Sequence, residues 1–115
     1  MLTDIYDHLK AGGLNPYFIG QHEGDCKKPY VVIKEGSAIP SIPSNYVGLK
    51  VIDMILYVPS SSFIELGKYE ARVKESLRDL RYLRRTGTET PSIPDDKKKA
   101  YTKSIEYIIQ RKVGR

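Results

Sequence analysis

Residues 48–58 read GLKVIDMILYV, and nonpolar side chains occupy odd and even positions alike over much of this run. A strand with one face in water alternates polar and apolar residues, whereas a strand covered on both faces does not. Pro59 ends the run, because proline cannot donate a hydrogen bond within a central strand. We therefore predict a central strand over residues 48–58 that is covered on each side.

A long helix is predicted to follow this strand. Ser62 and Glu65 have the spacing of a capping box, in which the two side chains bind free amide groups of the first turn. Residues 86–87 (TG) are expected to end the helix. Gly67 costs about 1 kcal/mol relative to alanine, which favours either close backbone packing or a helix start nearer Lys68. One apolar stripe at helical spacing is formed by Leu66, Tyr69, Val73, Leu77 and Leu80.

The chain before the central strand is predicted to hold one helix and one further strand, and residues 16–19 (PYFI) are compatible with a short extended piece between them. Leu2, Ile5 and Leu9 recur at helical spacing, and the glycine pair at 12–13 ends that helix. Residues 29–34 (PYVVIK) are rich in β-branched and aromatic side chains, which favour a strand. These two elements supply apolar surfaces that the central strand and the long helix can bury.

Two loops and a closing strand complete the prediction. Prolines, glycines and serines exclude regular structure through most of a flexible loop at about residues 35–48. A second loop is expected at about residues 87–99. Residues 101–111 alternate between apolar and polar side chains, which favours a strand, although residues 104–109 are compatible with a helix on propensity alone.

These elements define an α+β fold in one domain, residues 1–115. The chain has 115 residues, of which 40% are hydrophobic and 29% charged, enough for one core but not for two lobes with a cleft between them. The expected order is α-β-β-α-β. We expect a small antiparallel or mixed sheet of three to four strands, with the N-terminal helix and the long helix packed on it. This arrangement buries the apolar side of every predicted helix and strand.

Residue patterns that carry catalysis or cofactor binding are missing from the sequence. It has no glycine-rich phosphate loop, paired cysteines, His-Glu-x-x-His or Gly-x-Ser-x-Gly, so we expect no enzyme activity, cofactor or metal. His22, Asp25 and Cys26 are the nearest to a ligand cluster, and we interpret them as part of a polar surface loop. Asp53 stands alone in an apolar run, and we expect it to face solvent or to pair with a helix arginine.

Positive charge is concentrated in the second half of the chain. Residues 1–67 hold 5 lysines against 7 acidic residues, while residues 68–115 hold 14 basic residues against 7 acidic ones. Lys74, Arg78, Arg81 and Arg85 fall within an arc of about 60° on the predicted helix. This basic row is either a solvated surface or a contact for acidic protein or DNA phosphates.

A second candidate contact lies in the proline-containing loop. Isoleucines alternate with prolines there, and a tyrosine follows: Ile39, Pro40, Ile42, Pro43 and Tyr46. Proline reduces the entropy lost when a loop docks, so these apolar side chains are suited to contact a neighbouring subunit. The alternative is that the loop folds back and its side chains cover the core of its own subunit.

The order of elements from residue 48 onward resembles the tail terminator, or tail-completion, proteins of long-tailed bacteriophages. The matching pieces are ILYVP at 55–59, the capped helix after Ser62, RTG at 85–87, PDD at 94–96 and the closing strand through SIEY at 104–107. The N-terminal helix fits this order too. The resemblance covers most of the chain but consists of order and spacing, without a signature motif.

The resemblance implies a structural protein of the virion that has no catalytic residues. Such a subunit forms a ring, usually of six copies, that caps the tail tube and joins it to the neck or head connector. Contractile tails and headless bacteriocin particles use a similar collar. The implied partners are further copies of the chain, the tail tube protein, the neck or head-connector protein and DNA passing through the lumen, with no membrane. Assembly would take place in the host bacterial cytoplasm, and the product would lie in the tail or neck of the virion.

A different class of function also fits the charge distribution. A small basic nucleic-acid-binding or regulatory module would act through the basic row and the lysines at 97–99.

Overall fold

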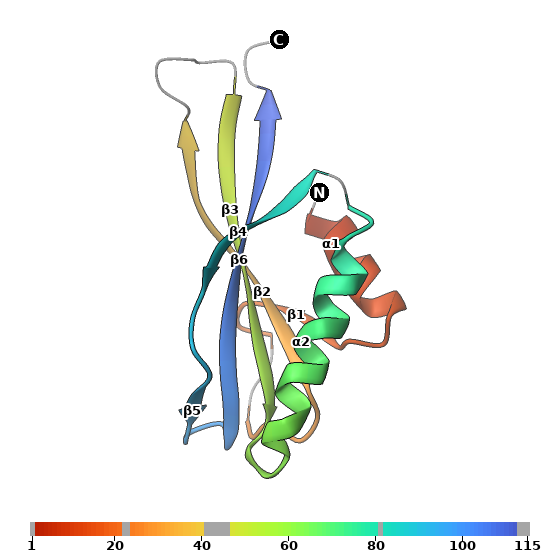
Figure 1. Ribbon diagram of the computed structural model, residues 1–115, viewed down its shortest axis with the longest axis vertical. Helices are drawn as coiled ribbons and strands as arrows, with labels where there is room; N and C mark the ends of the chain where they lie inside the picture. Colours follow the sequence, from red (N-terminus) through yellow and green to blue (C-terminus); the bar gives the residue numbers. More distant parts are fainter. Residues whose placement is uncertain (1, 22–23, 41–46, 81, 113–115) are drawn as a thin grey trace.

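The structure is a computed structural model that describes residues 2–21, 24–40, 47–80 and 82–112 (Figure 1). Its elements in chain order are α1 (Leu2–Ala11), β1 (Pro16–Phe18), β2 (Tyr30–Pro40), β3 (Val47–Pro59), the 3-10 turn η1 (Ser60–Ser62), α2 (Phe63–Leu77), β4 (Leu83–Glu89), β5 (Ile93–Asp95) and β6 (Ala100–Lys112).

The strands form one mixed sheet in the order β1-β2-β3-β6-β4, with β5 paired to β6. Among the described residues, β1 pairs in parallel with β2, and the other strand pairings are antiparallel. The α+β class is therefore confirmed, but the sheet has six strands where three or four were expected. The elements α1, β2, β3, α2 and β6 follow the predicted order. β1 corresponds to the short extended piece expected at residues 16–19, whereas the short strands β4 and β5 were not expected.

Both helices lie on the same side of the sheet (Figure 1). Alternate residues of β3 reflect this: Ile52, Met54, Leu56 and Val58 are fully buried, whereas the intervening side chains are only partly buried. A small cluster around Cys26, Tyr30 and Ala100 covers part of the opposite face at one end. The expectation that β3 is covered on each side along its length is thus wrong for the described residues, because the helices supply only one layer.

The helix layer is joined to the rest of the chain by polar as well as apolar contacts. Ile5 and Leu9 of α1 are fully buried, and Tyr69 of α2 donates its hydroxyl to the backbone carbonyl of Leu14. Ser76 donates to the carbonyl of His8, which ties α2 to α1. These bonds fix the two helices as one layer over β3.

The start of α2 was predicted correctly but its end was not. The helix begins at Phe63, directly after Ser62, and ends at Leu77, well before the predicted end near residues 86–87. The amide groups of Leu80 and Leu83 donate to the carbonyls of Leu77 and Leu80, in turns that lead into β4. Leu80 and Leu83 are buried, so these turns bring into the core apolar side chains that a longer helix could also have placed there.

Both predicted loops contain strand. β2 continues to Pro40 and β3 begins at Val47, so the loop expected at 35–48 is wrong for these parts, and residues 41–46 lie outside the described residues. A register shift between Glu35 and Ala38 accommodates Gly36, as β-bulges do. The loop expected at 87–99 likewise contains the end of β4 and all of β5, while β6 confirms the closing strand.

The long strands give the molecule an elongated shape. The principal extents are 49 × 26 × 24 Å, and β2, β3 and β6 extend together beyond the helix layer (Figure 1). No helix in the described part of the chain has the length and apolarity needed to span a membrane.

Candidate interaction surfaces

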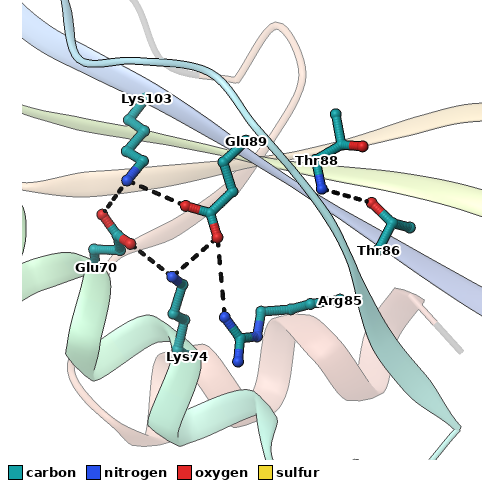
Figure 2. Close-up of polar contacts among 7 residues, drawn as sticks. All are labelled: Glu70, Lys74, Arg85, Thr86, Thr88, Glu89 and Lys103. Atoms are coloured by element: carbon teal, nitrogen blue, oxygen red, sulfur yellow. Dashed lines mark hydrogen bonds and ion pairs between the residues drawn. The ribbon is translucent and has the colours of Figure 1, made fainter.

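Four charged side chains form a closed network between α2 and the sheet (Figure 2). Lys74 Nζ lies 2.7 Å from Glu70 and 3.1 Å from Glu89. Lys103 Nζ lies 2.8 Å from Glu70 and 3.2 Å from Glu89. The four side chains are 17–25% exposed, so water screens them only in part. The network joins α2 to β4 and β6.

The charges in this network stabilise one another. Burial raises the pKa of Glu70, but hydrogen bonds from Lys103 and Lys74 outweigh it and hold that pKa below its ordinary value. The hydrogen bond from Lys74 likewise lowers the pKa of Glu89, and the bond to Glu70 raises the pKa of Lys103. Two carboxylates therefore neutralise two ammonium groups, which makes the network an internal clamp of the fold.

The predicted basic row is divided among different elements. Lys74 lies in α2 but is held in the network, and Arg78 follows the helix and pairs with Glu75 at 2.9 Å. Arg85 lies in β4, half exposed, 3.9 Å from Glu89, and Arg81 lies outside the described residues. A single helical row over these four residues is therefore wrong, because α2 ends before three of them.

The exposed cations of the second half gather on other elements. Arg84 and Arg85 are exposed on β4, which lies at one edge of the sheet. Lys97 and Lys99 are exposed between β5 and β6, where Lys99 lies 3.5 Å from Asp25. Lys98 is partly buried, with its ammonium 6.0 Å from the centre of the Tyr57 ring.

The residues of the proline-containing loop are only partly placed. Ile39 and Pro40 belong to β2, where their backbones pair with Leu49 and Gly48 of β3. Ile42, Pro43 and Tyr46 lie outside the described residues. The first two positions are thus part of a long antiparallel pairing, which sequence reasoning had assigned to an irregular loop.

The candidate ligand residues form no site in the described part of the chain. Cys26 is buried, its Sγ donates to the carbonyl of Lys28 at 3.3 Å, and burial raises its pKa to about 11. Asp25 pairs with Lys99, and His22 lies outside the described residues. Over residues 2–21, 24–40, 47–80 and 82–112 no three histidine, cysteine or acidic side chains are grouped as metal ligands.

A groove between α1 and α2, of about 810 Å³, is lined by charged and small residues. Its walls include Asp7, Glu75 and Asp79, and Arg72 donates from there to the backbone carbonyl of Gly12 at 3.1 Å. The groove therefore lies directly over a junction that the fold uses internally.

The sheet face turned away from the helices has an unusual composition. We call it the outward sheet face and define it by Val32, Lys34, Asp53, Ile55, Ser104 and Glu106. Two adjoining hollows, of about 250 and 210 Å³, lie on it and share Lys34 and Ile55. One-sided antiparallel sheets normally present polar residues to water, and the first hollow follows this rule. The apolar side chains Val32 and Ile55 in the second hollow are the feature that needs an explanation.

Two carboxylates adjoin each other on this face. Asp53 of β3 lies directly opposite Glu106 of β6, and Lys34 of β2 lies on its other side. Burial raises the pKa of Asp53, the charge of Glu106 raises it further, and Lys34 opposes both. The sequence predicted that Asp53 faces solvent or pairs with a helix arginine. The first alternative is correct, since Asp53 is partly exposed and alternates with Ile52 and Met54, which are buried on the other face of the strand.

Some of these contacts between charged residues could not be predicted from the sequence. Glu70 and Lys74 are four apart on a helix and were recognisable as a pair, but Lys103 is 33 residues from Glu70. Glu106 was recognisable only as a polar position in the alternation of β6. Its partnership with Asp53 depends on the register between two strands distant in the chain.

The chain matches no protein-family model and no curated protein sequence.

Proposed function

We propose that this chain is a structural assembly protein that forms a ring on the end of the tail tube of a phage or phage-like particle. The ring would end the growth of the tube and join it to the neck or head connector. The observation that carries this proposal is the outward sheet face: β3 has the composition of a strand covered on both sides, but the helices cover only one. We infer that another protein molecule covers the second face of this strand.

The order and spacing of the elements support the same proposal. The strand through residues 55–59, the helix that begins after Ser62 and the closing strand through residues 104–107 are the pieces on which the resemblance to tail terminators rests. The partners that follow are further copies of the chain, the tube protein, the neck or head-connector protein and DNA in the lumen. The proposed location is the tail or neck of the virion.

The proposal is tested by polymerising a purified tail tube protein with and without this chain and imaging the products by negative-stain electron microscopy. We expect rings of this chain, most tellingly of six copies, at the tube ends, together with shorter tubes. Serum albumin at the same concentration is the control for crowding. Tubes of unchanged length with bare ends would refute a terminating role.

A small basic nucleic-acid-binding module remains the second candidate. It is favoured by the exposed cations Arg84 and Arg85 on one sheet edge and Lys97 and Lys99 beyond β5. Such a module binds DNA tightly with a steep dependence on salt, whereas a terminator binds it weakly at most. Titration of labelled duplex DNA at two salt concentrations separates the two functions.

A further inference from the structure

The three charged residues of the outward sheet face, together with Arg84 on β4, follow one another in a defined order, and Lys98 lines one of the hollows beside them. From β2 across β3 to β6, the side chains of Lys34, Asp53 and Glu106 are neighbours in register. On the next strand, β4, Arg84 lies opposite Ile108 and so shares the face of Glu106, two residues further along β6. The signs across the sheet are therefore positive, negative, negative and positive.

The outer surface of α2 carries the opposite order. Four exposed residues follow one another along the side of the helix that borders α1, where Arg72 also donates to the carbonyl of Gly12, and we call them the outer row of α2: Glu65, Lys68, Arg72 and Glu75. At about 100° per residue they fall within an arc of about 80°. Their signs are negative, positive, positive and negative.

The two charge series also match in length. Ten residues of helix, from Glu65 to Glu75, rise about 15 Å. Three steps between neighbouring strands, from Lys34 to Arg84, span about 14 Å. Because Arg84 is displaced along its strand, a helix that satisfied all four charges would cross the strands obliquely.

Apolar groups beside both charge series lack cover. On the sheet, the hollows next to Asp53 have Ile55 and Val32 in their walls. On the helix, Ile64 is 79% exposed.

We propose that the outer row of α2 of one copy packs on the outward sheet face of a second copy of this chain. The helix layer and the outward sheet face lie on opposite sides of the molecule, so one copy offers both surfaces at once (Figure 1). The contact is head-to-tail, and its repetition closes a ring when the rotation between copies permits. This inference rests on the proposed ring function and names the interface that builds the ring.

A symmetric arrangement of two outward sheet faces fits the charges less well. A two-fold axis parallel to β3 and β6 and between them would place Asp53 over Glu106 of the other copy, and like charges across an interface are strongly unfavourable. The outer row of α2 instead brings Lys68 and Arg72 to these two carboxylates.

The interface is tested by charge reversal on both sides. Asp53→Lys and Lys68→Glu are each expected to lower the association constant between copies about tenfold or more. The double variant Asp53→Lys/Lys68→Glu is expected to recover most of the association, because it restores opposite charges. Lys97→Glu changes the net charge by the same amount as Lys68→Glu, at an exposed site outside both surfaces, and serves as the matched control for that variant. The readout is the subunit number by sedimentation velocity over a concentration series, with and without the tube protein.

A second variant keeps the test valid if Asp53→Lys fails to fold. Ile64→Asp alters a side chain that lies outside the core, and we expect it to keep the thermal unfolding curve of the wild type while losing association. Wild-type rings that withstand all three single substitutions would overturn this interface and leave the ring function standing. A wild type that stays monomeric even with the tube protein would overturn the ring function, and the interface with it.

Discussion

Asp53 and Glu106 lie directly opposite each other on β3 and β6, two carboxylates in one register pair. Like charges in such positions destabilise a sheet. Burial and the neighbouring charge both raise the pKa of Asp53, so the fold bears a cost at neutral pH that the charge of Lys34 opposes. A cost of this kind is consistent with a surface that is neutralised by a cationic partner.

Replacing Asp53 with asparagine is expected to stabilise the isolated subunit. At pH 7 we predict that Asp53→Asn raises the free energy of unfolding by about 0.5–1 kcal/mol, because it removes the like-charge contact. Because the pKa of Asp53 is raised in the folded chain, the cost is complete above that raised pKa, decreases as the pH falls through it, and is absent below the ordinary value of 3.8. Urea denaturation at pH 7 and at pH 3.5 checks this, with Asp25→Asn as the control. A destabilised variant at pH 7 would contradict the account of this pair.

Breaking the charged network is expected to weaken the attachment of α2. Glu89→Gln leaves Lys74 and Lys103 with Glu70 as their remaining carboxylate, and we predict a loss of about 1–2 kcal/mol in the free energy of unfolding. Glu65→Gln is the matched control, since its pair with Lys68 is 4.0 Å long and exposed, and its loss should stay below about 0.5 kcal/mol. Equal effects of the two substitutions in urea denaturation would show that the network is no stronger than a surface pair.

The same network predicts a dependence of stability on pH. Glu70 and Glu89 have pKa values below the ordinary 4.5 in the folded chain, so their contribution is complete above pH 4.5 and is lost as the pH falls through the lowered values. Melting temperatures measured from pH 7 to pH 3 should therefore fall more steeply for the wild type than for Glu70→Gln/Glu89→Gln. Parallel curves would contradict the assignment.

The hydroxyl of Tyr69 is expected to stabilise the junction between α1 and the sheet. It donates to the carbonyl of Leu14, and Tyr69→Phe would leave that acceptor without this donor in a buried place. We predict a loss of about 1–2 kcal/mol in the free energy of unfolding, measured in urea. Tyr6→Phe, at a partly exposed ring, is the control and should change it by less than about 0.5 kcal/mol.

The thiol of Cys26 is expected to be unreactive in the folded chain. Burial raises its pKa to about 11, so little thiolate is present at pH 8. We predict slow alkylation by iodoacetamide in buffer and rapid alkylation in urea, followed by mass spectrometry. Equally fast alkylation in both conditions would show that the loop around Cys26 opens readily.

The elements that could be predicted from the sequence are those with a local signature. The helical spacing of Leu66, Tyr69, Val73 and Leu77 and the alternation in β6 reflect how each element packs, so a short window suffices to read them. β4 has no such signature, because its strand conformation depends on pairing with β6. The residues LRRTGTE extend the helical pattern on propensity and were misread as its end.

The contact surfaces were harder to predict than the fold. Lys74 was assigned to an exposed basic row because the helix was expected to continue past Leu77, and its partner Glu89 lies on a strand that the sequence did not reveal. The second half of the β2–β3 pairing was missed because Gly36 and Pro40 disfavour a regular strand. A register shift after Glu35 accommodates the glycine, and the proline stands at the end of the strand, where it does no harm.

The central claim, that this chain assembles into a closed ring, is tested most directly by native mass spectrometry of the purified protein over a concentration series, with and without the tail tube protein. The account predicts a discrete closed oligomer, most tellingly a hexamer, that forms alone or when the tube protein is added. A chain that remains monomeric or dimeric at every concentration, and that does not bind the tube protein, would contradict this claim.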